Sequence, residues 1–197
     1  YELWVGGSHA GSNSFNETMR YATGYENMKY YLGSSDYLRQ NTQWVALRLS
    51  DLYLTYAEAL LQANNDHQGA VDQIDIVRAR VGLPGLVQSN PGKRLLTDKD
   101  ALIEELLRER VCELGMEDSR FFDLIRWKLY NVFEKQLHGL HVYKHKDTGE
   151  YKFVPYELTK YPRVWWTSGF EPRWCLSAFP SVEINKGYGL VQNPGWE

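Results

Sequence analysis

Residues 109–127 read ERVCELGMEDSRFFDLIRW, and this stretch places acids, arginines and aromatic rings beside one another. Arg120, Asp123 and Arg126 alternate in sign at a spacing of three residues. Because residues three or four apart share a helix face, these charges can pair with one another. The neighbouring rings of Phe122 and Trp127 indicate that some of this pairing takes place partly out of water. The stretch therefore predicts an internally neutralised joint between two helices.

The acids of this joint have a second interpretation. Glu109, Glu113 and Glu117 lie four residues apart, and three aligned carboxylates could hold a metal or carry acid–base chemistry. A di-iron site in a helix bundle, however, needs a His three residues after a Glu, and that spacing does not occur here. We therefore interpret the acids as partners of the arginines. The predicted structural ion-pair network consists of Glu109, Arg110, Glu113, Glu117, Arg120, Asp123 and Arg126.

Composition limits the class of protein. A chain of 197 residues with 43% apolar residues can form one domain with a real core. A net charge of −3 without a basic block argues against a nucleic-acid partner. No apolar run reaches the roughly 18 residues that a membrane-spanning helix requires. Two cysteines are too few for a disulfide framework, and the apolar neighbours of Cys112 predict a buried free thiol.

Apolar periodicity predicts four helices between residues 44 and 137. The first spans Leu49 to Leu61, with an apolar face at three- and four-residue spacing, and the second runs from Ala70 to Val81. The third begins after Thr97 as N-cap, and the fourth covers about 118–135. The apolar face of the first helix consists of Leu49, Leu52, Tyr53, Tyr56, Ala57, Leu60 and Leu61. The residues of the third helix that we expect to face inward are Leu102, Ile103, Leu106, Leu107, Val111 and Leu114.

The region after residue 137 changes character. Residues 141–144 and 151–154 have strand composition and flank a turn at 147–150, which predicts a β-hairpin. The predicted fold is mainly α, with antiparallel, tetratricopeptide-like helix pairs and an irregular C-terminal region that contains the hairpin. We expect a single domain over 1–197, composed of a loop-rich part (1–43), the helical pairs (44–137), and the hairpin with an aromatic tail (138–197).

The aromatic tail is the candidate ligand site. Aromatic residues make up 14% of the chain, and Tyr161, Trp165, Trp166 and Trp174 fall within fourteen residues of the tail. Flat rings beside hydrogen-bonding groups suit a sugar, which has an apolar C–H face and a polar rim. The same rings could instead fold over the helices and complete their core. Both interpretations stay open.

A histidine trio invites a metal interpretation. His138, His141 and His145 would align as zinc ligands on a helix, but the surrounding residues favour a strand, where only His141 and His145 share a face. No cysteine or acid completes the set, so we expect solvated histidines, with no metal and no cofactor.

Three further segments carry a resemblance to a known family. Residues 48–59 read RLSDLYLTYAEA, residues 74–84 read IDIVRARVGLP, and residues 192–196 read QNPGW. Together with the joint, and in this order, they resemble the SusD/RagB family of outer-membrane nutrient-binding lipoproteins of Bacteroidetes. Two positions depart from the family pattern, in ways that put two local turns in question. Residues 179–182 read FPSV where the family has Phe-Pro-Ile-Pro, and Asp118 stands where Gly is common.

The resemblance implies a function without catalysis. A protein of this kind binds a glycan or oligosaccharide at the cell surface and delivers it to a SusC-like TonB-dependent transporter during polysaccharide utilization. It also implies that this chain is a C-terminal portion, with the lipid anchor outside it and much of the binding surface upstream. Two alternatives remain: a tetratricopeptide-like adaptor for a protein or peptide, and a helical glycoside hydrolase with two carboxylates about 5–9.5 Å apart.

Overall fold

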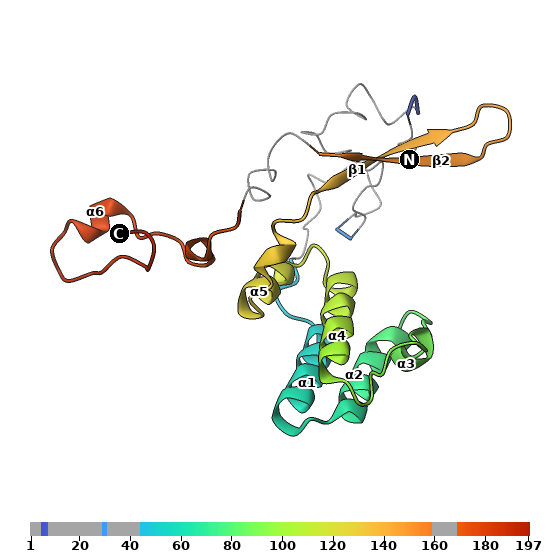
Figure 1. The fold of residues 1–197 in the computed structure, drawn as a ribbon, viewed down its shortest axis with the longest axis horizontal. Coiled ribbons are helices and arrows are strands. Elements are labelled where there is room, and N and C mark those ends of the chain that lie inside the picture. The colour runs from blue at the N-terminus through green and yellow to red at the C-terminus, as the bar shows by residue number, and fades with distance from the viewer. Residues whose placement is uncertain (1–4, 8–28, 31–43, 159–168) are drawn as a thin grey trace. The chain divides into compact units, whose positions relative to one another are not determined.

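The computed structural model describes residues 5–7, 29–30, 44–158 and 169–197. The chain divides into two compact units (Figure 1). The helical unit is Leu32–Arg126, and the C-terminal unit is Trp127–Glu197 together with Tyr1–Tyr31. The prediction of a mainly α-helical fold with one antiparallel hairpin is confirmed. The predicted single domain over 1–197, with its three segments, stays a prediction.

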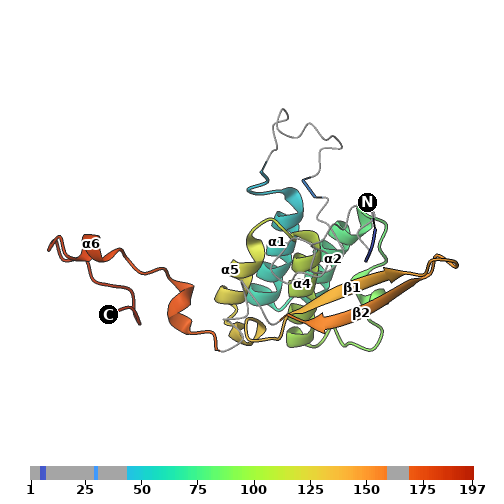
Figure 2. The same ribbon diagram turned by 90° about the horizontal axis from the view of Figure 1, so that it is seen from above.

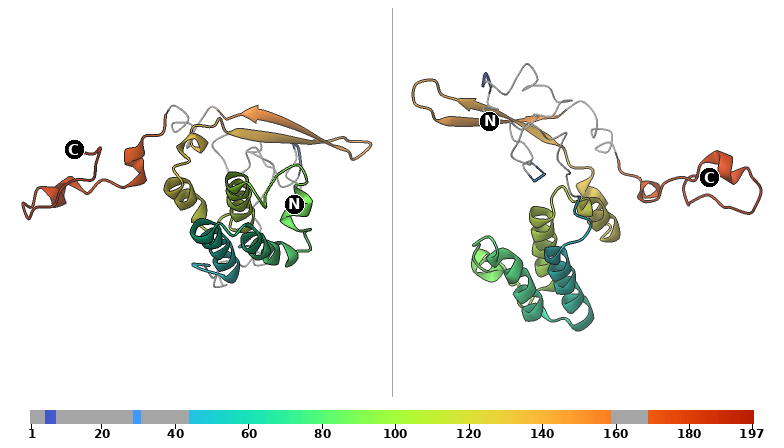
Figure 3. Two further views of the ribbon diagram at one scale, coloured as in Figure 1. Left: turned by 60° about the horizontal axis from the view of Figure 1, so that its bottom comes forward. Right: turned by 180° about the vertical axis from the view of Figure 1, so that it is seen from behind.

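The described part of the helical unit, from residue 44 on, contains five helices. They are α1 (Leu49–Asn64), α2 (His67–Ala79), the short α3 (Leu86–Ser89), α4 (Lys99–Glu113) and α5 (Ser119–Arg126). The first two form an antiparallel pair, and α4 packs against both (Figures 1 and 3). Figure 2 shows α5 beside α1 and α4. None of the described helices is both long enough and apolar enough to cross a bilayer.

The core lies where α1, α2 and α4 meet. Leu54, Ala57 and Leu61 of α1 are fully buried there, together with Ile74 of α2 and Leu102 of α4. The predicted apolar face of α1 is therefore only partly right. Leu49, Leu52 and Tyr56 lie on the exposed side of the helix, because α1 has more apolar positions than one helix pair can cover.

Asp66 and Asp98 cap the N-termini of α2 and α4. Asn65 closes α1 with a left-handed φ of 53°, and the Asp66 carboxylate then accepts the Gly69 N–H at 2.8 Å to cap α2. Asp98 caps α4 in the same way, since its Oδ1 accepts the Ala101 N–H at 3.1 Å. The prediction of Thr97 as N-cap is thus wrong by one residue. A carboxylate at the cap also suits the positive end of the helix dipole.

The inner face of α4 departs from the predicted apolar pattern. Glu105, Glu109 and Arg110 are buried on it, whereas Val111 and Cys112 are exposed. The predicted burial of the Cys112 thiol is therefore wrong. Charged pairs occupy the inward positions near the end of α4, and this rotates Cys112 to solvent.

The joint between α4 and α5 is a tight turn. Met116 and Asp118 both have left-handed backbone conformations, with φ of 65° and 61°. Asp118 therefore keeps a conformation that glycine adopts most easily, and aspartate tolerates it better than most residues. The helix after this turn ends at Arg126 instead of near residue 135, because Lys128 is again left-handed with φ 54°.

The C-terminal unit contains the predicted hairpin. Strand β1 (His138–Lys144) pairs antiparallel with β2 (Tyr151–Glu157), and Lys144 faces Tyr151 next to the turn. The backbone N–H of Val5 donates to the Val142 carbonyl at 2.7 Å on the other edge of β1. Its described residues also form two 3₁₀ turns, η3 (Tyr130–Val132) and η5 (Pro172–Cys175), and one short helix, α6 (Ser181–Ile184).

The C-terminal QNPGW segment closes a loop on itself. Gln192 exchanges two hydrogen bonds with the backbone of Phe179, at 2.8 and 3.0 Å. The Trp196 indole N–H donates to the Arg173 carbonyl at 3.0 Å, and the Arg173 guanidinium lies 5.3 Å from the centre of the indole ring. The FPSV departure leaves a regular turn, since α6 begins at Ser181 directly after Pro180.

Candidate functional site

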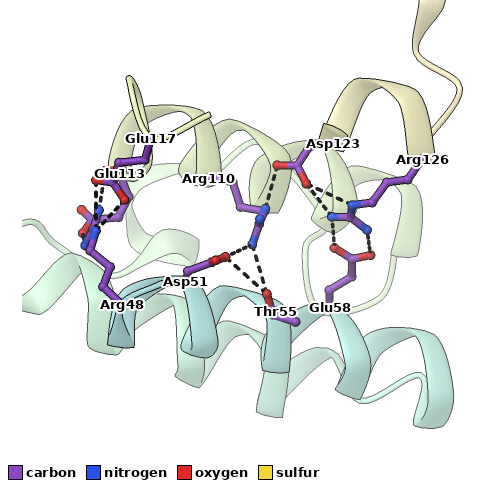
Figure 4. A network of polar contacts seen from close by, with 9 residues as sticks. All are labelled: Arg48, Asp51, Thr55, Glu58, Arg110, Glu113, Glu117, Asp123 and Arg126. Carbon is purple, nitrogen blue, oxygen red and sulfur yellow. Dashed lines mark hydrogen bonds and ion pairs between the residues drawn. The ribbon is translucent and has the colours of Figure 1, made fainter. Parts of the chain in front are cut away.

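An ion-pair network joins α1, α4 and α5 (Figure 4). Its first cluster is centred on Arg48, the residue before α1. The Arg48 guanidinium donates to Glu113 Oε1 at 2.5 Å and to Glu117 Oε2 at 2.8 Å, and also to the Glu113 carbonyl at 2.7 Å. Arg80 reaches the same Glu113 carboxylate at 2.9 Å. The start of α1 and the end of α2 are thereby tied to the end of α4.

The second cluster is a chain of alternating charges. Arg110 of α4 donates to Asp51 of α1 at 2.9 Å and to Asp123 of α5 at 2.8 Å. Arg126 of α5 then binds the other oxygen of Asp123 at 2.8 Å and forms a two-pronged pair with Glu58 of α1. Arg110 and Asp123 are both buried, so this chain replaces water around them with fixed partners.

A third pair lies between α2 and α4. The buried Arg78 guanidinium binds the buried Glu109 carboxylate at 2.7 Å, and its remaining N–H groups reach the Pro84 carbonyl and the Ser89 hydroxyl. Each of the three guanidinium nitrogens therefore has an acceptor. Such complete pairing is what allows a charge to be buried without a large desolvation cost.

The network changes proton affinities in the expected directions. Burial alone would raise the pKa of Glu113, but the hydrogen bonds from Arg48 and Ser50 and the charges of Arg48 and Arg80 outweigh it and lower that pKa. The pKa of Arg48 is raised, chiefly by its bond to Glu117, and that of Arg126 chiefly by its bond to Glu58. These shifts favour the charged forms of the Glu113 carboxylate and of the Arg48 and Arg126 guanidinium groups.

Of the seven residues that the sequence placed in the network, Arg110, Asp123 and Arg126 bind one another. Glu113 and Glu117 bind Arg48 instead, and Glu109 binds Arg78. Arg120 is the exception, since it forms no hydrogen bond or ion pair with another described residue, and burial lowers its pKa. Sequence reasoning missed the acids Asp51 and Glu58 on α1, and the base Arg48 beside them. A signal was present: these three are the charged positions of the RLSDLYLTYAEA segment.

The network holds α1, α4 and α5 together, and its charged groups are engaged with one another. A concavity of about 420 Å³ beside it is lined by Thr55, Glu58, Ala59, Gln62, Arg110 and Arg126. The charged groups in its wall already have partners, since Glu58 binds Arg126 and Arg110 binds Asp51 and Asp123. Among the described residues no group of three His, Cys, Asp or Glu side chains is arranged to hold a metal.

The three histidines have separate surroundings. His138 and His141 lie in β1, and the His141 ring stacks on Tyr156 with centroids 4.1 Å apart. His145 lies in the turn, where its Nδ1 accepts the Thr148 N–H at 3.1 Å.

Of the four candidate ligand residues, the structure describes one. Tyr161, Trp165 and Trp166 lie outside the described residues. Trp174 is partly buried in η5, with its ring edge-on to Phe170 at 5.5 Å. Phe170 is itself buried and stacks on Phe133 at 4.3 Å. Trp174 thus packs at one end of a small aromatic cluster within the C-terminal unit.

The hairpin presents rings that the sequence did not single out as a site. Tyr151 and Phe153 are about half exposed and stack with centroids 6.4 Å apart. The Lys144 ammonium lies 5.7 Å from the centre of the Tyr151 ring. Beside them is an open concavity of about 780 Å³, which Tyr143 and Tyr151 line together with charged turn residues.

Comparison with known proteins identifies the family. The SusD family matches residues 1–196, nearly the whole chain. A SusD-like protein of Bacteroides ovatus is 32% identical over 102 residues, which cover 47% of this chain and 16% of the relative. The crystal structure of a SusD-like protein from Bacteroides fragilis superposes with a TM-score of 0.62 at 30% identity, over 79% of this chain and 26% of that one. The chain belongs to the SusD family, and it spans only 16% and 26% of the lengths of these two relatives.

Proposed function

We propose that this chain is part of a surface lipoprotein of the outer membrane that captures a nutrient glycan without chemical change and passes it to a SusC-like TonB-dependent transporter. The observation that carries the proposal is the family match over residues 1–196. The proposed attachment to the outer membrane is through a lipid anchor.

The geometry of the helical unit supports binding over hydrolysis. A glycoside hydrolase needs two carboxyl groups free to give and take a proton about 5–9.5 Å apart. The acids that the sequence brought together are instead held by guanidinium groups, as in the pairs Arg110–Asp123 and Arg78–Glu109. These two carboxylates already accept hydrogen bonds from guanidinium groups, so they are not placed to serve a substrate. The helices serve as a rigid scaffold.

The proposed ligand contacts are aromatic rings of the C-terminal unit. Tyr161, Trp165, Trp166 and Trp174 are the candidates from the sequence, and the half-exposed Tyr151 and Phe153 add two rings. A sugar that covers about 100 Å² of one ring gains roughly 2.5 kcal/mol before association costs. Several rings must therefore act together.

Calorimetric titration with a panel of neutral and acidic oligosaccharides tests this function directly. We expect one class to bind, and Trp165→Ala with Trp166→Ala to weaken it at least tenfold, because each ring supplies roughly 1–2 kcal/mol. Trp44→Ala is the matched control, since it removes an exposed indole from the helical unit. Absence of binding to every glycan by the longer protein that includes these residues would contradict the proposal.

Two further readouts separate the alternatives. Chromatography of the oligosaccharides after long incubation distinguishes capture from hydrolysis, and any shortened product would favour the hydrolase. Affinity purification from outer membranes should recover a TonB-dependent transporter. Recovery of a soluble peptide partner with no transporter would favour the adaptor.

A further inference from the structure

The β1–β2 hairpin carries different side chains on its two faces, and the pairing register assigns each residue to a face. Cross-strand partners share a face, as do residues two apart on one strand. Lys144 pairs with Tyr151, and Val142 pairs with Phe153. These four side chains therefore share one face, which we call the Lys144 face. Because Val142 is buried, the face presents an ammonium group and two aromatic rings.

The two rings form a row along β2. Tyr151 and Phe153 are 50% and 52% exposed, their centroids lie 6.4 Å apart, and their planes differ by 26°. Exposed rings that lie side by side offer consecutive flat apolar surfaces, which suit a ligand made of consecutive units with apolar faces. An oligosaccharide chain has that form, whereas a single small molecule would cover only one of the rings.

The charge next to this row is positive. The Lys144 ammonium lies 5.7 Å from the centre of the Tyr151 ring, close enough for a cation–π contact that keeps it beside the row. The acid of this face is Glu157, six residues beyond Tyr151 on β2. At about 3.3 Å per residue that separation is roughly 20 Å, well beyond the Debye length of about 8 Å in physiological salt. A group bound on the rings is therefore attracted by Lys144 without repulsion from Glu157.

The charges of the turn leave this sign unchanged. The open concavity of about 780 Å³ beside the rings is lined by three lysines, Lys144, Lys146 and Lys152, and by two acids, Asp147 and Glu150. The Glu150 carboxylate accepts a hydrogen bond from the Thr148 hydroxyl at 3.4 Å, within the turn. An anionic group in the concavity therefore meets a lining with more cations than carboxylates.

We propose that Lys144, Tyr151 and Phe153 form a subsite for an acidic oligosaccharide. A sugar unit that lies on Phe153 and reaches Tyr151 brings its carboxylate or sulfate group to the Lys144 ammonium. The inference rests on the proposed function, glycan capture, and adds to it the charge class of the glycan. A neutral glycan can stack on the same rings, but it lacks the charge-assisted contact.

An anionic membrane surface is another partner of suitable charge, and it fits less well. Residues 144–150 read KHKDTGE, so the turn has no apolar side chain to enter a bilayer. The rings lie behind the turn, on β2. A ligand that lies along the strand reaches both rings, whereas a bilayer at the turn would first meet charges of both signs.

Calorimetric titration with three oligosaccharides of equal length tests the subsite. The probes are an oligogalacturonate for the carboxylate, a sulfated galacto-oligosaccharide for the sulfate, and a neutral galacto-oligosaccharide. Each is titrated into the longer protein that contains these 197 residues. We expect an acidic probe to bind about two- to fivefold more tightly than the neutral one, the effect of one exposed ion pair. Because salt screens such a pair, this preference should shrink in about 0.5 M NaCl.

Four variants assign the binding to these residues. Lys144→Gln should abolish the preference for the acidic probe and leave the neutral probe unchanged, whereas Lys144→Arg keeps the charge and should keep the preference. Phe153→Ala should weaken both probes alike, because it removes stacking and no charge. Lys135→Gln is the matched control, since it removes an exposed lysine of the same unit that does not line the concavity. It should change neither affinity.

Each of the other outcomes overturns the subsite. An acidic preference that survives Lys144→Gln places the anion elsewhere, and an equal loss in Lys135→Gln assigns the preference to net charge. Unchanged binding in Phe153→Ala removes the rings from the site. Binding of the neutral probe alone overturns the acidic class and leaves glycan capture standing, whereas absence of all binding contradicts glycan capture itself. Cosedimentation with phosphatidylglycerol vesicles that depends on Lys144, without oligosaccharide binding, would assign the turn to a membrane surface.

Discussion

Fourteen of the sixteen buried apolar side chains among the described residues lie in the helical unit, and only Val142 and Phe170 lie in the C-terminal unit. Among the described residues the helical unit also holds the buried charges, and two buried pairs join different helices: Arg78 with Glu109 and Arg110 with Asp123. The C-terminal unit uses backbone pairing, stacked rings and local loop closure instead. A scaffold must keep its shape without ligand, whereas a surface that meets a ligand needs exposed rings. The two units fit these two demands.

The largest effect expected from this contrast is at Asp123. Asp123→Ala leaves the buried Arg110 with one partner fewer, and breaking such a pair costs about 3–5 kcal/mol. Arg120→Ala is the control on the same helix, and we expect a clearly smaller loss because Arg120 pairs with no described residue. Urea unfolding followed by helical circular dichroism measures both. Equal losses would mean that the pairing of Asp123 adds nothing to the scaffold.

A substitution that creates a cavity in the core of each unit tests whether the two units are stabilised separately. Leu54→Ala in the helical core should cost about 2–5 kcal/mol. Val142→Ala should cost less than about 2 kcal/mol, because roughly two methylene groups are removed from a smaller core. Peptide-resolved hydrogen exchange should show faster exchange in α1, α2 and α4 for the first and in the hairpin strands for the second. If either substitution speeds exchange in both units alike, the two units do not unfold separately.

The sequence predicted most where its pattern was local and repeated. The 49–61 periodicity identified α1, and residues 147–150 identified the hairpin turn. It failed where one pattern had two explanations. Leu52 and Tyr56 have the spacing of a core face, and only the packing of α2 and α4 shows that the core lies on the Leu54 side.

The candidate site shows the same limit. The alternation of Asp123 and Arg126 marked the joint, but the partners on α1 lie more than fifty residues away in the chain. Sequence separation of that size leaves no periodic signal. Arg120 was included because it shares the alternation, but its side chain forms no hydrogen bond or ion pair with a described residue and is only attracted by the charge of Asp123. The end of α5 at Arg126 was also hidden, because no glycine or proline precedes the left-handed Lys128.

The N-cap of α4 gives a smaller and more local effect. Asp98→Ala removes the acceptor for the Ala101 N–H and should cost about 1 kcal/mol. Thr97→Ala should cost much less, since the Thr97 hydroxyl only donates to the Arg94 carbonyl at 3.4 Å. Thermal unfolding of the two variants at neutral pH measures the difference. A larger loss for Thr97→Ala would show that the helix begins one residue earlier.

The smallest of the expected effects is a difference between the two units in how much stability each loses at acid pH. Glu113 has a pKa below its ordinary value of 4.5, because the guanidinium bonds outweigh burial, so its stabilising effect is present above about pH 4.5 and is lost as pH falls through the lower folded pKa. The pKa of Glu183 is also lowered, first by Lys186 and then by Tyr188, but that cluster is exposed and solvent screens it. We therefore expect Glu113→Gln to reduce the drop in Tm between pH 7 and pH 3, and Glu183→Gln to leave it unchanged. Because the Glu113→Gln side chain still accepts a hydrogen bond, a difference that persists equally at both pH values would assign the effect to shape instead of charge.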